Sequence, residues 1–330
     1  MRAMRVGCLL LLALGAALAP RAALTAAGPE IVDVRKIWDR APHNAFTDLI
    51  RFQDRWLCVF REGRGHVSPD GALRVIESPD GVRWQSAALL TSPTSDLRDA
   101  KITLTPEGRL MLSGAEATHP PATASHHSVA WYSRDGREWG ERRRIGDPDM
   151  WLWRTEWHDG AAYSIGYSTY AEPDRNFVRL YRSKDGGRFE PLVERLHGEG
   201  YPNEHSLVFE PNGTAKCLLR RDGTPNSGLL GESRPPYTQW RWRNLGTRIG
   251  GPEMIRLPDG RLLAAVRLYD GKVRTSLCRV HPNRIEELLP LPSGGDTSYA
   301  GMVWHEGLLW ISYYSSHEGK TSIYLARVRV

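Results

Sequence analysis

LRDAKITLTPEGRLMLSGAE (residues 97–116) is the clearest example of a pattern that recurs along this chain. Polar Asp99 precedes a short apolar run, a turn ending in Gly108 follows, and a second apolar run leads to Glu116. Glycine at the last turn position supplies the positive φ that tight hairpin turns require. The segment therefore predicts a β-hairpin.

The same pattern occurs in five further segments, at residues 44–63, 153–168, 203–223, 251–271 and 298–315. Their leading residues recur about every 46–57 positions, which is the size of a four-stranded propeller blade. Outside the N-terminal segment, no amphipathic helix is evident. We therefore predict an all-β fold, a six-bladed β-propeller over residues 28–330. The leading residues are taken as equivalent: Asp48, Asp99, Glu156, Glu204, Glu253 and Tyr299.

A second repeated element has the form Ser-x-Asp-Gly-x-x-aromatic, at residues 78–84, 133–139 and 183–189. Short Ser and Asp side chains can accept hydrogen bonds from turn amides while glycine takes the left-handed position. The aromatic residue then packs against the hairpin. We expect these turns on the outer hairpins of the blades, and we interpret Asp80, Asp135 and Asp185 as structural rather than catalytic.

The N-terminal segment, residues 1–27, has the features of a secretory signal. Basic Arg2 and Arg5 precede a short apolar run, and small residues from Ala22 to Ala27 offer cleavage sites. The apolar run is shorter than the roughly 20 residues of a transmembrane helix. The sequence thus predicts an exported protein, periplasmic or extracellular, without a transmembrane anchor.

Composition and charge narrow the classes of partner. The net charge of +6 includes three arginines of the predicted signal, and no basic block marks a nucleic-acid site. Cys58, Cys217 and Cys278 lie in apolar, strand-like runs and are expected to be buried thiols. No sequence motif indicates a metal or another cofactor. We expect a monomer, and the modest positive surplus would suit an anionic small substrate.

The Ser-x-Asp-Gly turns resemble the Asp boxes of the bacterial sialidase (neuraminidase) superfamily, which has a six-bladed propeller. In residues 203–220 an Asn-Glu pair precedes Arg220, and Ser298-Tyr299 precedes the last hairpin, as in that family. The resemblance implies a glycan or glycoconjugate substrate. It further implies Tyr299 as nucleophile, Glu204 as its base, and Arg220 with Arg267 as a clamp for a substrate carboxylate. A neutral phenol avoids repulsion from that carboxylate.

The first repeat matches the family less well. Arg64 resembles a substrate-contacting arginine, and the loop after it should supply an acid/base, for which we consider Asp70 first, then His66, then Asp99. The arginine of the family's Phe-Arg-Ile-Pro motif is replaced by Ala45. Three arginines from other strands could take its place: Arg61, Arg98 or Arg154.

Several polar residues of the repeats admit two interpretations. Five of them either line the channel and bind substrate or neutralise one another in a buried ionic ring, the interpretation we favour for most: Asp48, Asp99, Lys101, Arg154 and Glu156. Arg61 and Glu253 are further candidates for lining the channel and binding substrate. The sequence leaves three functions open: a retaining, sialidase-like exo-glycosidase; a glycosidase of different specificity, or an inverting one, on the same scaffold; and a non-catalytic carbohydrate- or protein-binding propeller.

Overall fold

A computed structural model describes residues 28–119, 126–169 and 175–330. The predicted signal segment, residues 1–27, lies outside the described residues. No helix within the described ranges is long and apolar enough to cross a membrane.

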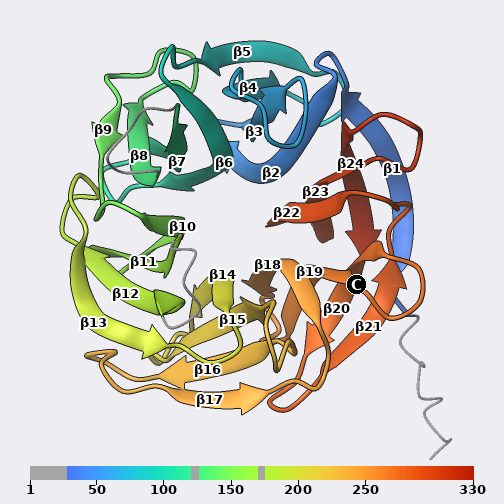
Figure 1. The fold of residues 1–330 in the computed structure, drawn as a ribbon. Coiled ribbons are helices and arrows are strands. Elements are labelled where there is room, and N and C mark those ends of the chain that lie inside the picture. Colours follow the sequence, from blue (N-terminus) through green and yellow to red (C-terminus); the bar gives the residue numbers. More distant parts are fainter. Residues whose placement is uncertain (1–27, 120–125, 170–174) are drawn as a thin grey trace, which may run out of the picture.

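Six antiparallel four-stranded sheets surround a central axis, which confirms the predicted six-bladed β-propeller (Figure 1). Within each sheet the first strand lies nearest the axis and the strands follow one another outward, apart from the last sheet. The first three blades contain β2 His43–Phe52, β3 Arg55–Gly63, β4 Ala72–Ser78, β5 Gln85–Leu90; β6 Ser95–Leu104, β7 Leu110–Thr118, β8 His126–Ser133, β9 Arg143–Arg144; and β10 Met150–His158, β11 Ala161–Ser168, β12 Val178–Ser183, β13 Glu190–His197. The others contain β14 Pro202–Phe209, β15 Ala215–Arg221, β16 Leu229–Ser233, β17 Arg241–Asn244; β18 Ile249–Arg256, β19 Leu262–Leu268, β20 Arg274–Val280, β21 Ile285–Pro290; and β22 Thr297–His305, β23 Leu308–Ser315, β24 Ser322–Arg329, with β1 Glu30–Trp38.

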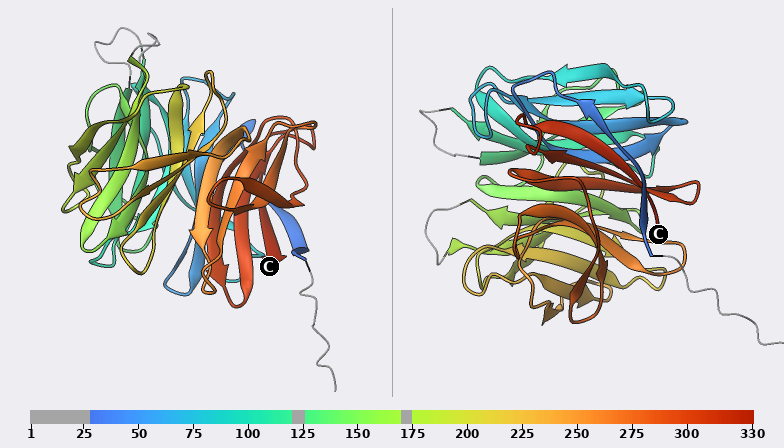
Figure 2. Two further views of the ribbon diagram at one scale, coloured as in Figure 1. Left: turned by 90° about the horizontal axis from the view of Figure 1, so that it is seen from below. Right: turned by 90° about the vertical axis from the view of Figure 1, so that its right-hand side faces the viewer.

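The ring is closed by the N-terminal strand. β1 pairs antiparallel with β24, so the sixth blade is built from both ends of the described chain (Figures 1 and 2). An ion pair between Asp33 and Arg327 spans this junction, with an oxygen–nitrogen distance of 2.7 Å. Because the first and last segments share one sheet, unravelling the sixth blade would require separating both ends at once.

The hydrophobic core lies between neighbouring blades. Trp56 of the first blade stacks on Trp310 of the sixth, with ring centroids 4.3 Å apart. All three cysteines within the described residues, Cys58, Cys217 and Cys278, are buried and free, as predicted. Burial of such apolar faces contributes about 25 cal/mol for each Å² removed from water.

The repeated turns have the geometry that the sequence predicts. Gly108, like the matching glycines of the later central hairpins, has a positive φ. In the outer hairpin of the first blade, Ser78 Oγ accepts a hydrogen bond from the Gly81 amide at 2.8 Å. Asp80 Oδ1 accepts from the amides of Val82 and Arg83, each at 2.9 Å. Ser78 and Asp80 therefore stabilise a turn far from the axis.

Every innermost strand carries a register shift at the same level of the propeller. In β22 the shift lies between Ser298 and Gly301, and in β6 between Arg98 and Lys101. Such a bulge re-aims the side chains that follow it. The first bulged residues of the six strands are Phe46, Asp99, Trp153, Asn203, Gly251 and Tyr299.

The bulges correct our alignment of the repeats. Asp48 and Glu253 lie two residues beyond the level of Asp99 and Tyr299, and Glu204 lies one residue beyond it. The leading residues chosen from the sequence therefore occupy different depths along the axis, because a bulge adds a residue that periodicity alone does not reveal.

Candidate active site

A phenol, a carboxylate and a guanidinium from two blades meet at the axis. Tyr299 of β22 donates a hydrogen bond to Glu204 Oε1 of β14 at 2.5 Å. Arg220 Nη1 of β15 donates to Glu204 Oε2 at 2.6 Å and to the Tyr299 oxygen at 3.1 Å. The phenol and carboxylate thus lie within the range needed for direct proton transfer.

The phenol is held in its neutral form. Burial raises the pKa of Tyr299 well above its ordinary value, and the charge of Glu204 raises it further, against the opposing effect of Arg220. Tyr299 therefore enters any reaction as a hydroxyl that must give up its proton, and the acceptor in contact with it is Glu204.

Glu204 is fixed by backbone as well as side-chain donors. The Gly251 amide, at the bulge of β18, donates to Glu204 Oε2 at 3.0 Å. Gly251 has a φ of 53°, and a Cβ there would lie 2.7 Å from Ser298 Oγ. Only glycine fits this close approach without displacing its neighbours. The sequence alone gave no reason to place Gly251 in the site.

Arg267 lies on the other side of Tyr299. Its guanidinium carbon is 5.5 Å from the centre of the Tyr299 ring. Arg267 Nε donates to the Thr297 carbonyl at 2.5 Å, and Nη2 donates to the Tyr314 hydroxyl at 3.1 Å. The Tyr314 hydroxyl in turn donates to Asp296 Oδ1 at 2.7 Å. Tyr314 and Asp296 were not among the predicted site residues, because nothing in the repeats distinguishes them.

Aromatic side chains form the walls around the phenol. Phe46, at the bulge of β2, meets Tyr299 edge to face with centroids 5.2 Å apart, and Trp153 lies 5.4 Å from the same ring. Phe46 directly follows Ala45, the position at which the family resemblance led us to look for an arginine. Arg98 covers the Phe46 ring from 5.7 Å and is one of the three replacements considered from the sequence.

The other two arginines considered as replacements, Arg61 and Arg154, form ion pairs with buried carboxylates of the protein. Arg61 is fully buried and binds Asp96 at 2.8 Å while also donating to the Gly65 and Ser68 carbonyls. Arg154 contacts Asp48 Oδ1 at 3.0 Å and Glu253 Oε2 at 2.9 Å. Arg154 therefore belongs to a buried ionic group below the site, in agreement with the ionic-ring interpretation. Glu253, which we expected to line the channel, also belongs to this group.

The buried ionic group has strongly perturbed acidities. Burial raises the pKa of Glu253 to about 7 and that of Glu156 to about 8, and it lowers the pKa of Lys101 to about 8. The same ring includes Asp48, one of whose oxygens accepts from the Ile102 amide at 2.9 Å. These groups link the first, second, third and fifth blades around the axis.

Asp99 stands out among the acid/base candidates. It lies at the bulge of β6 with a φ of 54° and is 6% exposed. Burial raises the pKa of Asp99, and its charge is near enough to raise the pKa of Tyr299. A carboxyl group whose pKa is raised by burial is better suited to donate a proton than one whose pKa is lowered.

The loop after β3 places the remaining candidates further out. Asp70 is exposed and lies 3.4 Å from Arg64, whose side chain is 73% exposed. Hydrogen bonds from Ser68 and the Arg64 amide outweigh burial and hold the pKa of Asp70 below its usual value. His66 lies nearer the phenol, since its ring packs on Phe46 with centroids 5.0 Å apart.

Comparisons with known proteins identify relatives of the fold. A protein of unknown function from Dyadobacter fermentans has a TM-score of 0.79 at 18% identity, covering 92% of this chain and 99% of that one. An α-L-arabinofuranosidase from Fusarium graminearum has a TM-score of 0.72 at 13% identity, covering 91% and 98%. Trypanosoma rangeli sialidase has a TM-score of 0.69 at 13% identity, covering 87% of this chain and 55% of that one.

These likenesses show the fold. At such low identity they assign neither activity nor site residues to this chain. No family model and no curated protein matches the sequence. The function must therefore be argued from the side chains around Tyr299.

Proposed function

We propose that this chain is an exported, retaining exo-glycoside hydrolase of sialidase type. Its substrate would be a glycan or glycoconjugate bearing a terminal sialic acid or a related anionic sugar. The observation that carries the proposal is the 2.5 Å hydrogen bond from the Tyr299 hydroxyl to Glu204. The similarity in fold to an arabinofuranosidase and a sialidase, both glycosidases by their names, supports the same reaction class.

In the first step the Tyr299 oxygen would attack the anomeric carbon while its proton passes to Glu204 Oε1. The glycosidic bond breaks, and the leaving oxygen takes a proton from the general acid. In the second step the general acid, now a base, accepts a proton from water. The water oxygen attacks the anomeric carbon, and the bond between that carbon and the Tyr299 oxygen breaks. Glu204 returns its proton to the phenolate oxygen. Arg220 would stabilise the negative charge that passes between Tyr299 and Glu204.

We assign the acid/base role to Asp99. Its carboxyl shares the axial level of Tyr299, and its raised pKa suits a group that must donate a proton first. Asp70 suits the role less well, because its pKa is lowered beside Arg64. His66 remains the second candidate because of its contact with Phe46.

Recognition of an anionic sugar would fall to Arg267 and Arg98. Arg267 lies against the Tyr299 ring, and its Nη1 makes no side-chain hydrogen bond within the described residues, so it is available to a substrate carboxylate. Arg98 lies over Phe46, and its Nε is buried without a partner within the described ranges. Together they would replace the clamp that the absent Phe-Arg-Ile-Pro arginine completes in sialidases.

One contact favours a second candidate, a glycosidase of different specificity. Arg220 Nη2 is paired with Asp222 Oδ2 at 2.9 Å. The Asp222 carboxylate therefore already occupies one of the guanidinium nitrogens that would bind a substrate carboxylate. A substrate without a carboxylate would leave this pair undisturbed.

The test is hydrolysis of fluorogenic glycosides by the wild type, Tyr299→Phe and the matched control Tyr313→Phe. Tyr313 is also buried in the last blade, but its hydroxyl binds the Pro292 carbonyl. We expect turnover of a sialoside to fall at least 1,000-fold in Tyr299→Phe and to persist in the control. Undiminished activity in Tyr299→Phe would reject the nucleophile, and wild-type preference for arabinofuranosides or uronides would select the second candidate.

A further inference from the structure

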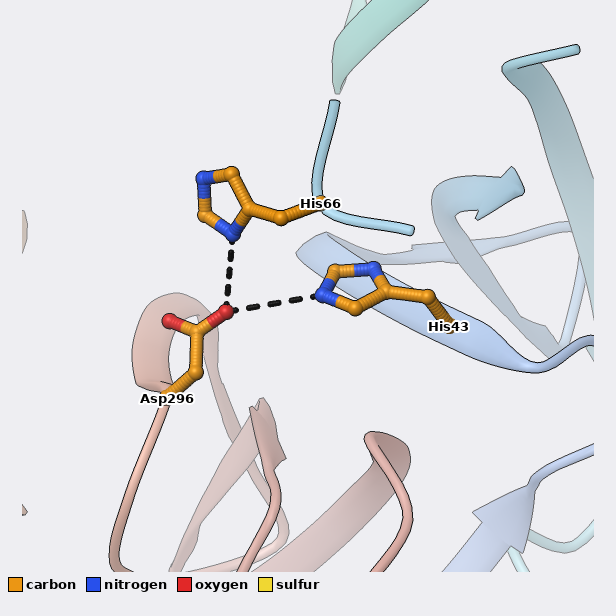
Figure 3. Close-up of side chains that lie close together, drawn as sticks. All are labelled: His43, His66 and Asp296. Carbon is orange, nitrogen blue, oxygen red and sulfur yellow. Dashed lines mark hydrogen bonds and ion pairs between the residues drawn. The ribbon is translucent and has the colours of Figure 1, made fainter. Parts of the chain in front are cut away.

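Three side chains from opposite ends of the chain meet beside the candidate site. His43 begins β2, His66 lies in the loop after β3, and Asp296 immediately precedes β22 (Figure 3). Asp296 Oδ2 lies 2.8 Å from His66 Nδ1 and 3.5 Å from His43 Nε2. These residues are 23 and 230 positions apart along the chain, so no local motif could have indicated the cluster.

We propose that His43, His66 and Asp296 bind a divalent transition-metal ion of the zinc class. Imidazole nitrogen and carboxylate oxygen are ligands that such ions prefer. The three ligand atoms lie within 4.8 Å of one another. Zinc bonds of about 2.0–2.1 Å in tetrahedral geometry place neighbouring ligand atoms about 3.3 Å apart. The distances from Asp296 Oδ2 to the two histidine nitrogens, 2.8 and 3.5 Å, lie on either side of this value. The ion would take the place of the hydrogen shared by His66 and Asp296.

The carboxylate is prepared for this role by its other contacts. Tyr314 donates to Asp296 Oδ1 at 2.7 Å, and Arg267 Nη2 lies 3.5 Å from the same oxygen. Both groups therefore act on Oδ1 and leave Oδ2 to face the histidines. Although burial opposes ionisation, hydrogen bonds from His43, His66 and Tyr314 hold the pKa of Asp296 below its usual value. Outer contacts of this kind orient ligating carboxylates in metal sites.

The two histidines differ in mobility and access. His43 is 8% exposed, fixed at the start of a central strand, and its Nδ1 is buried without a hydrogen-bond partner among the described residues. The His66 side chain is 50% exposed, so it can adjust by the fraction of an ångström that coordination requires. Three protein ligands leave a fourth position for water or a ligand, as in catalytic zinc sites.

The position of the cluster would give the ion a role at the site mouth. His66 packs on Phe46, and Phe46 packs on Tyr299, so one aromatic side chain separates the ligands from the phenol. The ion would add positive charge beside Phe46, next to Ala45, where the family resemblance led us to expect an arginine. An anionic group bound at the mouth could occupy the fourth coordination position. Metal binding itself does not depend on the proposed hydrolysis.

The test is isothermal titration calorimetry with zinc added to the purified, metal-stripped protein. The visible absorption of protein-bound cobalt(II) is a second readout. We expect one ion per chain in the wild type and at least tenfold weaker binding in both His66→Ala and Asp296→Asn. The control His281→Ala removes a histidine paired with Glu286 on the fifth blade and should bind like the wild type. Circular dichroism establishes that each variant is folded.

Two results would overturn the proposal. One is a wild type that binds no zinc in the titration, which would leave the cluster as a hydrogen-bonded contact between the loop after β3 and the last blade. The other is folded His66→Ala and Asp296→Asn that bind zinc as tightly as the wild type, which would place the ion elsewhere. Neither result would bear on the Tyr299–Glu204 assignment, because the assay does not measure turnover.

Discussion

Replacing Arg154 by methionine should destabilise the whole propeller while leaving the chemistry in place. Arg154 reaches Asp48 and Glu253 and also donates to the Ala300 carbonyl at 2.6 Å, so it joins strands of four blades. Its removal leaves two buried carboxylates without their principal counterion. Breaking a buried ion pair from one side costs about 3–5 kcal/mol.

The expected change in Tm follows from the size of the domain. An unfolding entropy of about 2.1 cal/mol/K per residue over roughly 300 residues gives about 0.6 kcal/mol/K. Arg154→Met should therefore lower Tm by about 5–8 °C at neutral pH. Lys101 remains close enough to interact with Asp48, which favours the lower end of that range.

The assay is differential scanning calorimetry alongside the matched control Arg188→Met. Arg188 has an 86% exposed side chain and only a 3.8 Å contact with Glu190, so its loss should change Tm by less than 1 °C. In the folded fraction of Arg154→Met, KM should remain within about threefold of the wild-type value. An unchanged Tm together with a greatly raised KM would refute the ionic-group reasoning and restore Arg154 as a substrate ligand.

Three further predictions concern the acid/base, the ionic group and the outer turns. Asp99→Asn should reduce turnover far more for glycosides with poor leaving groups than for activated aryl glycosides, and equal losses in steady-state assays would reject Asp99 as the acid. Because the pKa of Glu156 is raised to about 8, its stabilising contribution is complete below its unfolded value near 4.5 and disappears as pH rises through about 8. Glu156→Gln should therefore flatten the decline of Tm over that window, and an unaltered Tm–pH curve would contradict this sign. Ser78→Ala leaves the Gly81 amide unpaired and should cost about 1–3 kcal/mol of unfolding free energy in urea titration, whereas Thr91→Ala, at an exposed position, should be neutral.

The repeats carry enough information for the fold and for part of the site. Hairpin glycines such as Gly108 and apolar runs at blade spacing predict six sheets, because each feature follows from local backbone chemistry. Glu204 and Tyr299 come close because the repeats place both on innermost strands, β14 and β22, at levels one residue apart, and Arg220 lies on the adjacent strand β15.

The remainder depends on features that periodicity does not encode. The bulges set the depth of each side chain, so Asp48 and Glu253 fall below the site while Phe46 enters it. Asp296 joins His43 and His66 only because ring closure brings the last blade beside the first. Contacts between segments so far apart in the sequence are visible only in the three-dimensional structure.

The most direct test of the central claim is intact-protein and peptide mass spectrometry after reaction with an activated fluorinated sugar. Fluorine beside the anomeric carbon slows the second step, so the covalent sugar–enzyme intermediate accumulates. The account predicts one sugar per chain, attached to the oxygen of Tyr299 and absent from Tyr299→Phe. A substrate turned over without any adduct, or an adduct on a different residue, would contradict it.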